Sequence, residues 1–177
     1  MDYGHRLQFG ANITPVNDDP LAPVALAQRA EELGLDIVTV QDHPYQPRFH
    51  ETWTLLSWIA GATSRIALSP NVLNVPMRMP AVVARSAASL DLLAGGRVEL
   101  AVGAGAFWDA MAAMGVKRLT PGEAVSALEE AIEIMRGVWD LSTGRPLHVR
   151  GTHHTVAGIE RGPAPAHRIP VHVGAAK

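Results

Sequence analysis

An acidic residue and an imidazole stand side by side in this chain, directly after a short apolar run. Asp42 and His43 follow Ile37-Val38-Thr39-Val40, in a segment that continues into Pro44. Histidine titrates near neutral pH, so an imidazole held at a strand end can give a proton to a bound ring or take one from it. His43 is one candidate for this role, and Asp42 beside it is a candidate to orient the ring. The competing interpretation is that the two residues pair only to fix a loop.

Two further segments place polar residues or glycines where an apolar run ends. Asn71, Val72 and Asn74 follow one such run, with Pro70 before them. A proline and a sharp exit predict a bulge, and bulges are frequent beside ligands; an ordinary turn is the alternative. Residues 103–105 (Gly-Ala-Gly) end the next run. Their spacing matches neither a dinucleotide fingerprint nor a P-loop, but glycines let a backbone approach a flat ring closely.

Composition excludes several other chemistries. Cysteine is absent, the eight histidines have no tight ligand spacing, and we expect no metal site. His153 and His154 are adjacent, so in a strand they would face opposite sides. No Gly-x-Ser-x-Gly elbow supports a serine hydrolase. With 15 basic and 17 acidic residues the chain offers no cationic face for nucleic acid. No apolar run reaches ~18 residues, so we expect neither a membrane span nor a leader, and a cytoplasmic protein.

The elements that must position these residues alternate between strands and amphipathic helices. Strands are predicted near residues 7–13, 37–40, 66–72, 98–102 and 169–173. Helices are predicted over 20–33, 52–63, 80–94, 108–114 and 121–139, and a hairpin over 147–156. This alternation predicts an α/β fold with a parallel sheet, either doubly wound or a (β/α) barrel, in one domain over residues 1–177.

The polar residues at successive strand ends favour the barrel, because barrel sites are assembled from the loops that follow each strand. A doubly wound nucleotide-binding sheet is disfavoured because the first loop, residues 13–20, contains no glycine for a phosphate. A barrel has eight strands and typically ~250 residues, however, whereas five strands are counted here.

Several motifs resemble, in their order along the chain, those of the luciferase-like monooxygenase family. They are Ala-Glu-Glu-Leu-Gly-Leu-Asp (30–36), Gln-Asp-His-Pro (41–44), Asn-Val-Leu-Asn-Val-Pro-Met-Arg-Met-Pro (71–80), Ser-Leu-Asp-Leu-Leu-Ala-Gly-Gly-Arg-Val-Glu-Leu (89–100), Gly-Ala-Gly-Ala-Phe (103–107), Leu-Glu-Glu-Ala-Ile-Glu-Ile-Met-Arg (128–136), and Gly-Pro-Ala-Pro with Ile-Pro-Val-His-Val-Gly-Ala (162–175). The resemblance covers nearly the whole chain. It implies a luciferase-like (β/α)8 TIM barrel, present here as about the first four and a half β/α units.

The resemblance also implies a cofactor, either FMN or the 5-deazaflavin coenzyme F420. With FMN the implied reaction is oxygenation of a small organic substrate, and with F420 it is hydride transfer. His43 would then lie next to the reactive ring with Asp42 beside it, and a non-proline cis peptide at Asn71–Val72 would back the ring. The implied cofactor-binding residues are Asn71, Val72, Asn74, Gly103, Ala104 and Gly105. Phe107 and Trp108 are predicted to line the substrate pocket.

The chain departs from the family pattern in two ways. Ala106 stands where some sugar-phosphate-oxidising F420 enzymes carry a glutamate, which argues against that reaction. The second half of the barrel has no counterpart in these 177 residues, so the chain is interpreted as an expressed fragment, the product of a shortened gene, or a half barrel completed by association. An open half barrel would expose strand edges and an apolar interior, so we expect a homodimer or a higher assembly. The alternative function is a non-catalytic remnant or accessory half barrel that binds no cofactor.

Overall fold

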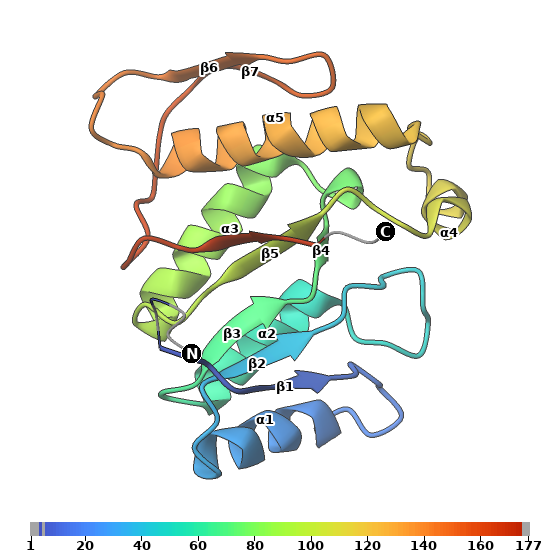
Figure 1. The fold of residues 1–177 in the computed structure, drawn as a ribbon, viewed down its shortest axis with the longest axis vertical. Coiled ribbons are helices and arrows are strands. Elements are labelled where there is room, and N and C mark those ends of the chain that lie inside the picture. Colours follow the sequence, from blue (N-terminus) through green and yellow to red (C-terminus); the bar gives the residue numbers. More distant parts are fainter. Residues whose placement is uncertain (1–3, 5, 175–177) are drawn as a thin grey trace.

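Parallel strands alternate with helices along most of the chain in the computed structural model, which describes residue 4 and residues 6–174 (Figure 1). The elements are β1 (Gly10–Ile13), α1 (Ala22–Glu32), β2 (Ile37–Val40), α2 (Thr52–Ala62), β3 (Ala67–Pro70), β4 (Leu73–Asn74), the 3-10 turn η1 (Val75–Met77), α3 (Pro80–Ala94), β5 (Leu100–Gly103), α4 (Trp108–Ala113), α5 (Pro121–Trp139), β6 (Leu147–Arg150), β7 (Thr155–Ile159) and β8 (Val171–Val173). None of these helices is long and apolar enough to cross a membrane.

The strands follow one another across the sheet in chain order, as in a barrel. β1, β2 and β3 pair in parallel, and so do β4, β5 and β8. A bridge between Leu68 and Val98 joins the two groups. A doubly wound sheet would reverse its strand order at a switch point, and this sheet does not. In the described part of the chain the sheet is open and curved rather than closed, and β6 and β7 form a separate antiparallel hairpin over α5 (Figure 1).

Four strand boundaries differ from the prediction. The strand predicted over 66–72 is β3 and ends at Pro70; the cis peptide Asn71–Val72 follows it, and the short β4 begins at Leu73. The strand predicted over 98–102 is β5, which spans Leu100–Gly103. β8 begins after Pro170, which has no N–H to donate to a neighbouring strand. Ile169, predicted to open that strand, is instead buried in the core. β1 is confined to 10–13 within the predicted 7–13.

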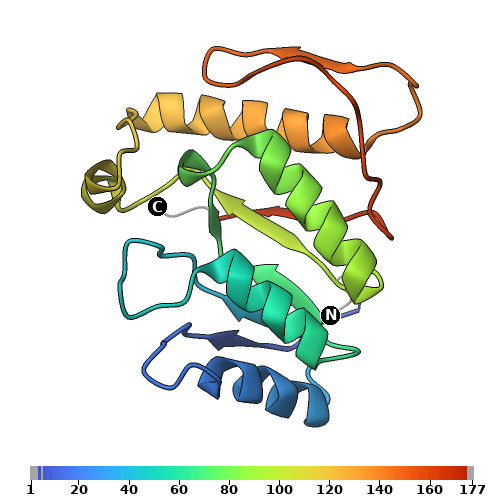
Figure 2. The same ribbon diagram turned by 180° about the vertical axis from the view of Figure 1, so that it is seen from behind.

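Helix ends follow local signals in the sequence. α5 begins with a capping box in which Thr120 and Glu123 satisfy each other's main-chain N–H groups, with Pro121 in the first turn. α3 ends at Gly95, whose left-handed φ of 70° suits glycine. α1 starts at Ala22 rather than at Pro20. Figure 2 shows α2 and α3 side by side against the sheet.

The core consists of two apolar clusters on the helix-covered face. One lies among β1–β3, α1 and α2; the other lies among β4, β5, α3, α5 and the hairpin. Trp53 packs against both, and the Trp139 indole donates to the Ala84 carbonyl oxygen (2.8 Å), which fastens α5 to α3.

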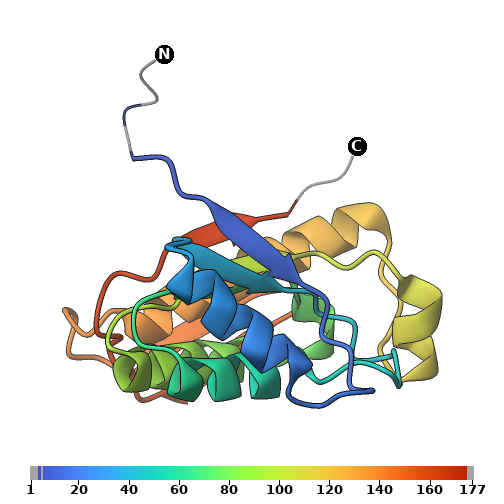
Figure 3. The same ribbon diagram turned by 90° about the horizontal axis from the view of Figure 1, so that it is seen from below.

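The opposite, uncovered face of the sheet carries mainly polar or small side chains, which corrects the expectation of an exposed apolar interior. Figure 3 shows helices α1, α2 and α3 gathered on one side of the strands. On the other side Thr39 donates to Asn12 (2.9 Å), and His172 pairs with Glu99 (2.9 Å). Because β2 alternates strictly, Val38 and Val40 are fully buried toward the helices. The open face can therefore contact water without exposing a large apolar surface.

Candidate functional site

The carboxyl ends of β2, β4 and β5 bring together residues that are far apart in the sequence. Asn74 lies opposite Gly103 in the parallel register of β4 and β5. The Asn74 main-chain N–H donates to the Asp42 carboxylate (2.7 Å), and the Asn74 amide donates to the Asp42 carbonyl oxygen. The segments around residues 42, 71–74 and 103 therefore form one edge of the sheet, as the strand order predicts.

Val72 occupies the centre of this edge. A Cβ added at Gly103 would lie 2.7 Å from one Val72 methyl, and a Cβ added at Gly174 would lie 2.9 Å from the other. Both strand ends thus need glycine to admit the Val72 side chain. The expected non-proline cis peptide at Asn71–Val72 is confirmed, with Asn71 exposed and Val72 half-buried at the surface.

Asp42 is held by an arginine that the sequence analysis did not identify. Its carboxylate is fully buried, and Arg78 reaches both oxygens, with Nη1 2.6 Å from Oδ2 and Nη2 2.9 Å from Oδ1. Arg78 also donates to Glu51 (2.6 Å), which caps the N-terminus of α2 through the Thr54 N–H. Burial raises the pKa of Asp42 above its usual range, although Arg78 and the Asn74 N–H oppose the rise.

This pairing corrects the expectation that Asp42 orients His43. The carboxylate oxygens are taken by Arg78 and Asn74, so Asp42 joins β2 to the β4–η1 segment. Asn74, predicted to bind cofactor, is 8% exposed and directs both of its nitrogens at Asp42, which makes it a structural link here. The available signal for Arg78 was its position as the one cation in the segment 71–80, between two apolar methionines.

The His43 imidazole instead pairs with Tyr45, a second residue that the sequence analysis did not identify. Nδ1 lies 2.6 Å from the phenol oxygen. Phe107 meets the imidazole edge-on at 5.3 Å between ring centroids and lies 5.9 Å from the Tyr45 ring. Burial and the nearby Asp42 raise the pKa of Tyr45, while the Asn74 side chain opposes the rise. Phe107, 57% exposed, therefore connects the end of β5 to the loop after β2.

The two residues predicted to line a substrate pocket separate in the structure. Phe107 joins His43, whereas Trp108 packs on Gly105, where an added Cβ would lie 3.3 Å from the indole and 2.9 Å from Met111. Gly105 has a φ of 93°, so this loop conformation favours glycine independently of the space around it. Residues 103–105 thus pass between Val72 on one side and α4 on the other.

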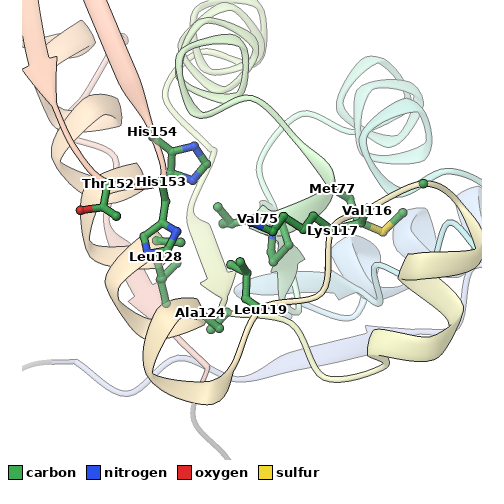
Figure 4. A pocket seen from close by; sticks show the side chains of 14 residues that line it. Val75, Met77, Val116, Lys117, Leu119, Ala124, Leu128, Thr152, His153 and His154 are labelled. Atoms are coloured by element: carbon green, nitrogen blue, oxygen red, sulfur yellow. The ribbon is translucent and has the colours of Figure 1, made fainter.

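A cavity of about 470 Å³ lies on the helix side of this loop, lined by both apolar and basic residues (Figure 4). Val75, Leu119 and Leu128 form part of its apolar wall, and His153 and His154 border it from the turn between β6 and β7. Both histidines line one cavity because they lie in a turn, which corrects the expectation that they face opposite sides of a strand. Across residue 4 and residues 6–174, no group of three or more His, Asp and Glu side chains is arranged to hold a metal ion.

Comparisons with known proteins agree with this architecture. A secondary alcohol dehydrogenase that depends on F420, solved with an F420–acetone adduct, superimposes with a TM-score of 0.81 at 24% identity, over 94% of this chain and 52% of that one. The oxygenating constituent of 3,6-diketocamphane monooxygenase from Pseudomonas putida, solved with FMN, gives 0.73 at 20% identity, over 94% and 51%. At these identities the likeness establishes the fold, an α/β fold matching about half of a luciferase-like TIM barrel.

Sequence relatives place the chain more narrowly. It is 32% identical over 177 residues to the F420-dependent glucose-6-phosphate dehydrogenase of Amycolatopsis mediterranei, covering 96% of this chain and 52% of that protein. It is also 32% identical over 172 residues to an uncharacterised protein of Mycobacterium tuberculosis, covering 85% and 58%. The chain thus spans about half the length of these curated relatives. The model of the family described as luciferase-like monooxygenase matches residues 4–177, and the chain belongs to that family.

Proposed function

We propose that this chain forms the cofactor-facing strand edge of an FMN- or F420-dependent oxidoreductase that acts on a small organic substrate. The observation that supports the proposal is the convergence at one edge of His43, the Asn71–Val72 peptide and the glycine loop with Phe107. The family relationship adds support, because relatives and structural neighbours include both F420-dependent dehydrogenases and an FMN-containing oxygenase.

The residues at this edge fit a flat ring system. Val72 offers a half-buried apolar side chain, and the adjoining Asn71 is exposed. Gly103, Ala104 and Gly105 add backbone free of bulky side chains, which suits a close approach. When bound, FMN supplies oxygenation chemistry and F420 supplies hydride transfer. Val72, Asn71 and residues 103–105 would hold either group.

His43 is the polar group that we assign to the reacting centre. Its Nδ1 is engaged by Tyr45, and within the described residues no hydrogen bond occupies Nε2. Nε2 can therefore meet an oxygen of substrate. Phe107 and Tyr45 contact the imidazole with their rings, and Asp42 keeps the end of β2 in register with Asn74. Ala106 brings no acid to the neighbouring position, so we do not assign sugar-phosphate oxidation to this chain.

Titration of the purified chain with FMN, reduced FMN and F420, followed by absorbance and fluorescence, tests the proposal. We expect saturable binding of one of them at micromolar concentration. His43→Ala should retain that binding and lose turnover, whereas His148→Ala, a change on the exposed side of β6, should affect neither. Unchanged turnover in His43→Ala would refute the assigned role, and absence of binding to all three would favour the non-catalytic alternative.

We also propose that the chain self-associates through its open strand edges. β1 pairs only with β2 and β8 only with β5 among the described strands, so each leaves one row of main-chain groups unpaired. Light scattering should then give a mass at least twice that of the 18.9 kDa chain. A monodisperse monomer would contradict this proposal.

A further inference from the structure

The surroundings of the His43 ring are asymmetric: its Nδ1 side has a short hydrogen bond and its flanks are aromatic. Nδ1 lies 2.6 Å from the Tyr45 hydroxyl, with the two rings 5.4 Å apart and tilted by 59°. Phe107 and Phe49 lie 5.3 and 6.3 Å from the imidazole centroid. Neither phenylalanine can accept or donate a conventional hydrogen bond, so Tyr45 is the polar partner of Nδ1 within the described residues.

We propose that Tyr45 is a positioning residue that holds neutral His43 in the tautomer with its proton on Nε2. This inference rests on the proposed function, in which Nε2 faces the reacting centre. The hydrogen bond would make the Tyr45 hydroxyl the donor and Nδ1 the acceptor. The single proton of the neutral ring is then at Nε2, where it forms a donor for an oxygen atom.

The neighbours of the phenol favour this direction of donation. A partly buried hydroxyl needs an acceptor for its proton. Within the described part of the chain no carboxylate or carbonyl oxygen makes a hydrogen bond with the Tyr45 hydroxyl. Nδ1 of His43 is the acceptor that lies within reach of this hydroxyl, at 2.6 Å, and both nitrogens of the neighbouring Asn74 are directed at Asp42. The phenol therefore directs its proton to Nδ1.

The charges around this pair are consistent with a neutral phenol. Burial and the Asp42 charge both raise the pKa of Tyr45, which keeps its hydroxyl protonated at neutral pH. Asp42 is itself bound by Arg78 on both oxygens and makes no hydrogen bond to the imidazole. The phenol is therefore the side chain that sets the protonated nitrogen of His43, in the role that a carboxylate was expected to fill.

Nuclear magnetic resonance of the ¹⁵N-histidine-labelled chain tests this directly, without any cofactor. Long-range ¹H–¹⁵N spectra at about pH 8, where an unperturbed histidine is neutral, distinguish the two tautomers by the separation of the ring nitrogen shifts. His43→Gln identifies the His43 signals among the eight histidines. We expect the wild-type chain to show the Nε2–H pattern for His43. In Tyr45→Phe the two nitrogen shifts should converge, as they do when both tautomers are populated.

Two comparisons distinguish the hydrogen bond from Tyr45 from mere aromatic packing around His43. Phe107→Leu removes an aromatic neighbour but keeps the phenol, so it should leave the tautomer unchanged. A wild-type Nδ1–H pattern, which needs no variant to observe, would overturn the proposal, as would an unchanged Nε2–H pattern in Tyr45→Phe. Titration of the same samples with FMN and F420 judges the proposed function separately. A Tyr45-dependent tautomer without cofactor binding would refute that function and leave the tautomer assignment intact.

Discussion

Replacing Arg78 by methionine should destabilise the fold far more than loss of an ordinary surface ion pair. Arg78 contacts both oxygens of a carboxylate whose side chain is 0% exposed, and is itself 17% exposed. Breaking a buried pair leaves an uncompensated charge, which costs about 3–5 kcal/mol. Arg29→Met is the matched control, because Arg29 and Glu32 form an ion pair with both side chains 64% exposed, where the expected loss is about 0.5 kcal/mol or less.

Urea unfolding followed by tryptophan fluorescence measures the difference. With a slope of about 1–3 kcal/mol per molar urea, a loss of this size lowers the midpoint by about 1 M or more. Asp42→Asn in the Arg78→Met background removes the stranded charge, so the double variant should recover part of the stability. A loss below about 1 kcal/mol in Arg78→Met would refute the view that this pair holds β2 to β4.

The stability lost in Arg78→Met should also depend on pH, in a direction that the pKa of Asp42 determines. Burial already raises the pKa of Asp42, and without Arg78 the rise should be larger. A carboxyl with a raised folded-state pKa stabilises the fold fully below its unfolded pKa and loses that contribution as pH rises through the folded value. The deficit of Arg78→Met should therefore grow as pH rises above about 4, the pKa of an aspartate in the unfolded chain. A deficit that is the same at pH 3 and at pH 8, or that shrinks as pH rises, would show that the stranded carboxylate is not its cause.

Two further changes test other parts of the fold. Gly103→Ala should lower the free energy of unfolding by about 1–3 kcal/mol and weaken cofactor binding, because its Cβ would lie 2.7 Å from a Val72 methyl. Gly122→Ala in α5 is the control, because a Cβ there meets nothing within 4 Å. In the same thermal and binding assays this control should be neutral or stabilising. The pKa of Glu31 is lowered from 4.5 to about 2. Burial raises this pKa, but hydrogen bonds from the N–H groups of residues 64–66 lower it by more. The contribution of Glu31 to stability is therefore present above pH 4.5 and is lost as pH falls toward 2. Glu31→Gln should cost about 1–2 kcal/mol at pH 7 and flatten the decline of stability in acid; equal acid profiles in the two proteins would contradict this.

Elements bounded by local signals were predictable from the sequence. α5 has its proline, its capping box and its apolar stripe within residues 120–139, and the structure assigns that helix over 121–139. The division between β3 and β4 was not visible in the same way, because Asn71–Val72 reads as a continuation of an apolar run. Pro70 and the polar exit after the strand predicted a bulge there, whereas the cis peptide at Asn71–Val72 was expected only from the family resemblance.

The site was predictable in location but not in its pairings. Successive strand ends placed Asp42, Asn71 and Gly103 together because parallel strands share one edge. The cation that pairs with Asp42 could not be chosen from the sequence, because Arg78 lies 36 residues away and is one of 15 lysines and arginines. The Tyr45–His43 contact spans only two residues, so it was available locally; the adjacent Asp42 was taken as the partner because it is charged.

The polar side chains on the uncovered face of the sheet affect how this half of a barrel can exist. The side chains on this face hydrogen-bond in pairs, Thr39 with Asn12 and His172 with Glu99. Contact of this face with water therefore exposes little apolar surface. Such a surface can stay in contact with water without a covering layer of protein. The tendency of this sheet to associate is then confined to the free edges of its two outer strands, β1 and β8, rather than spread over its concave face.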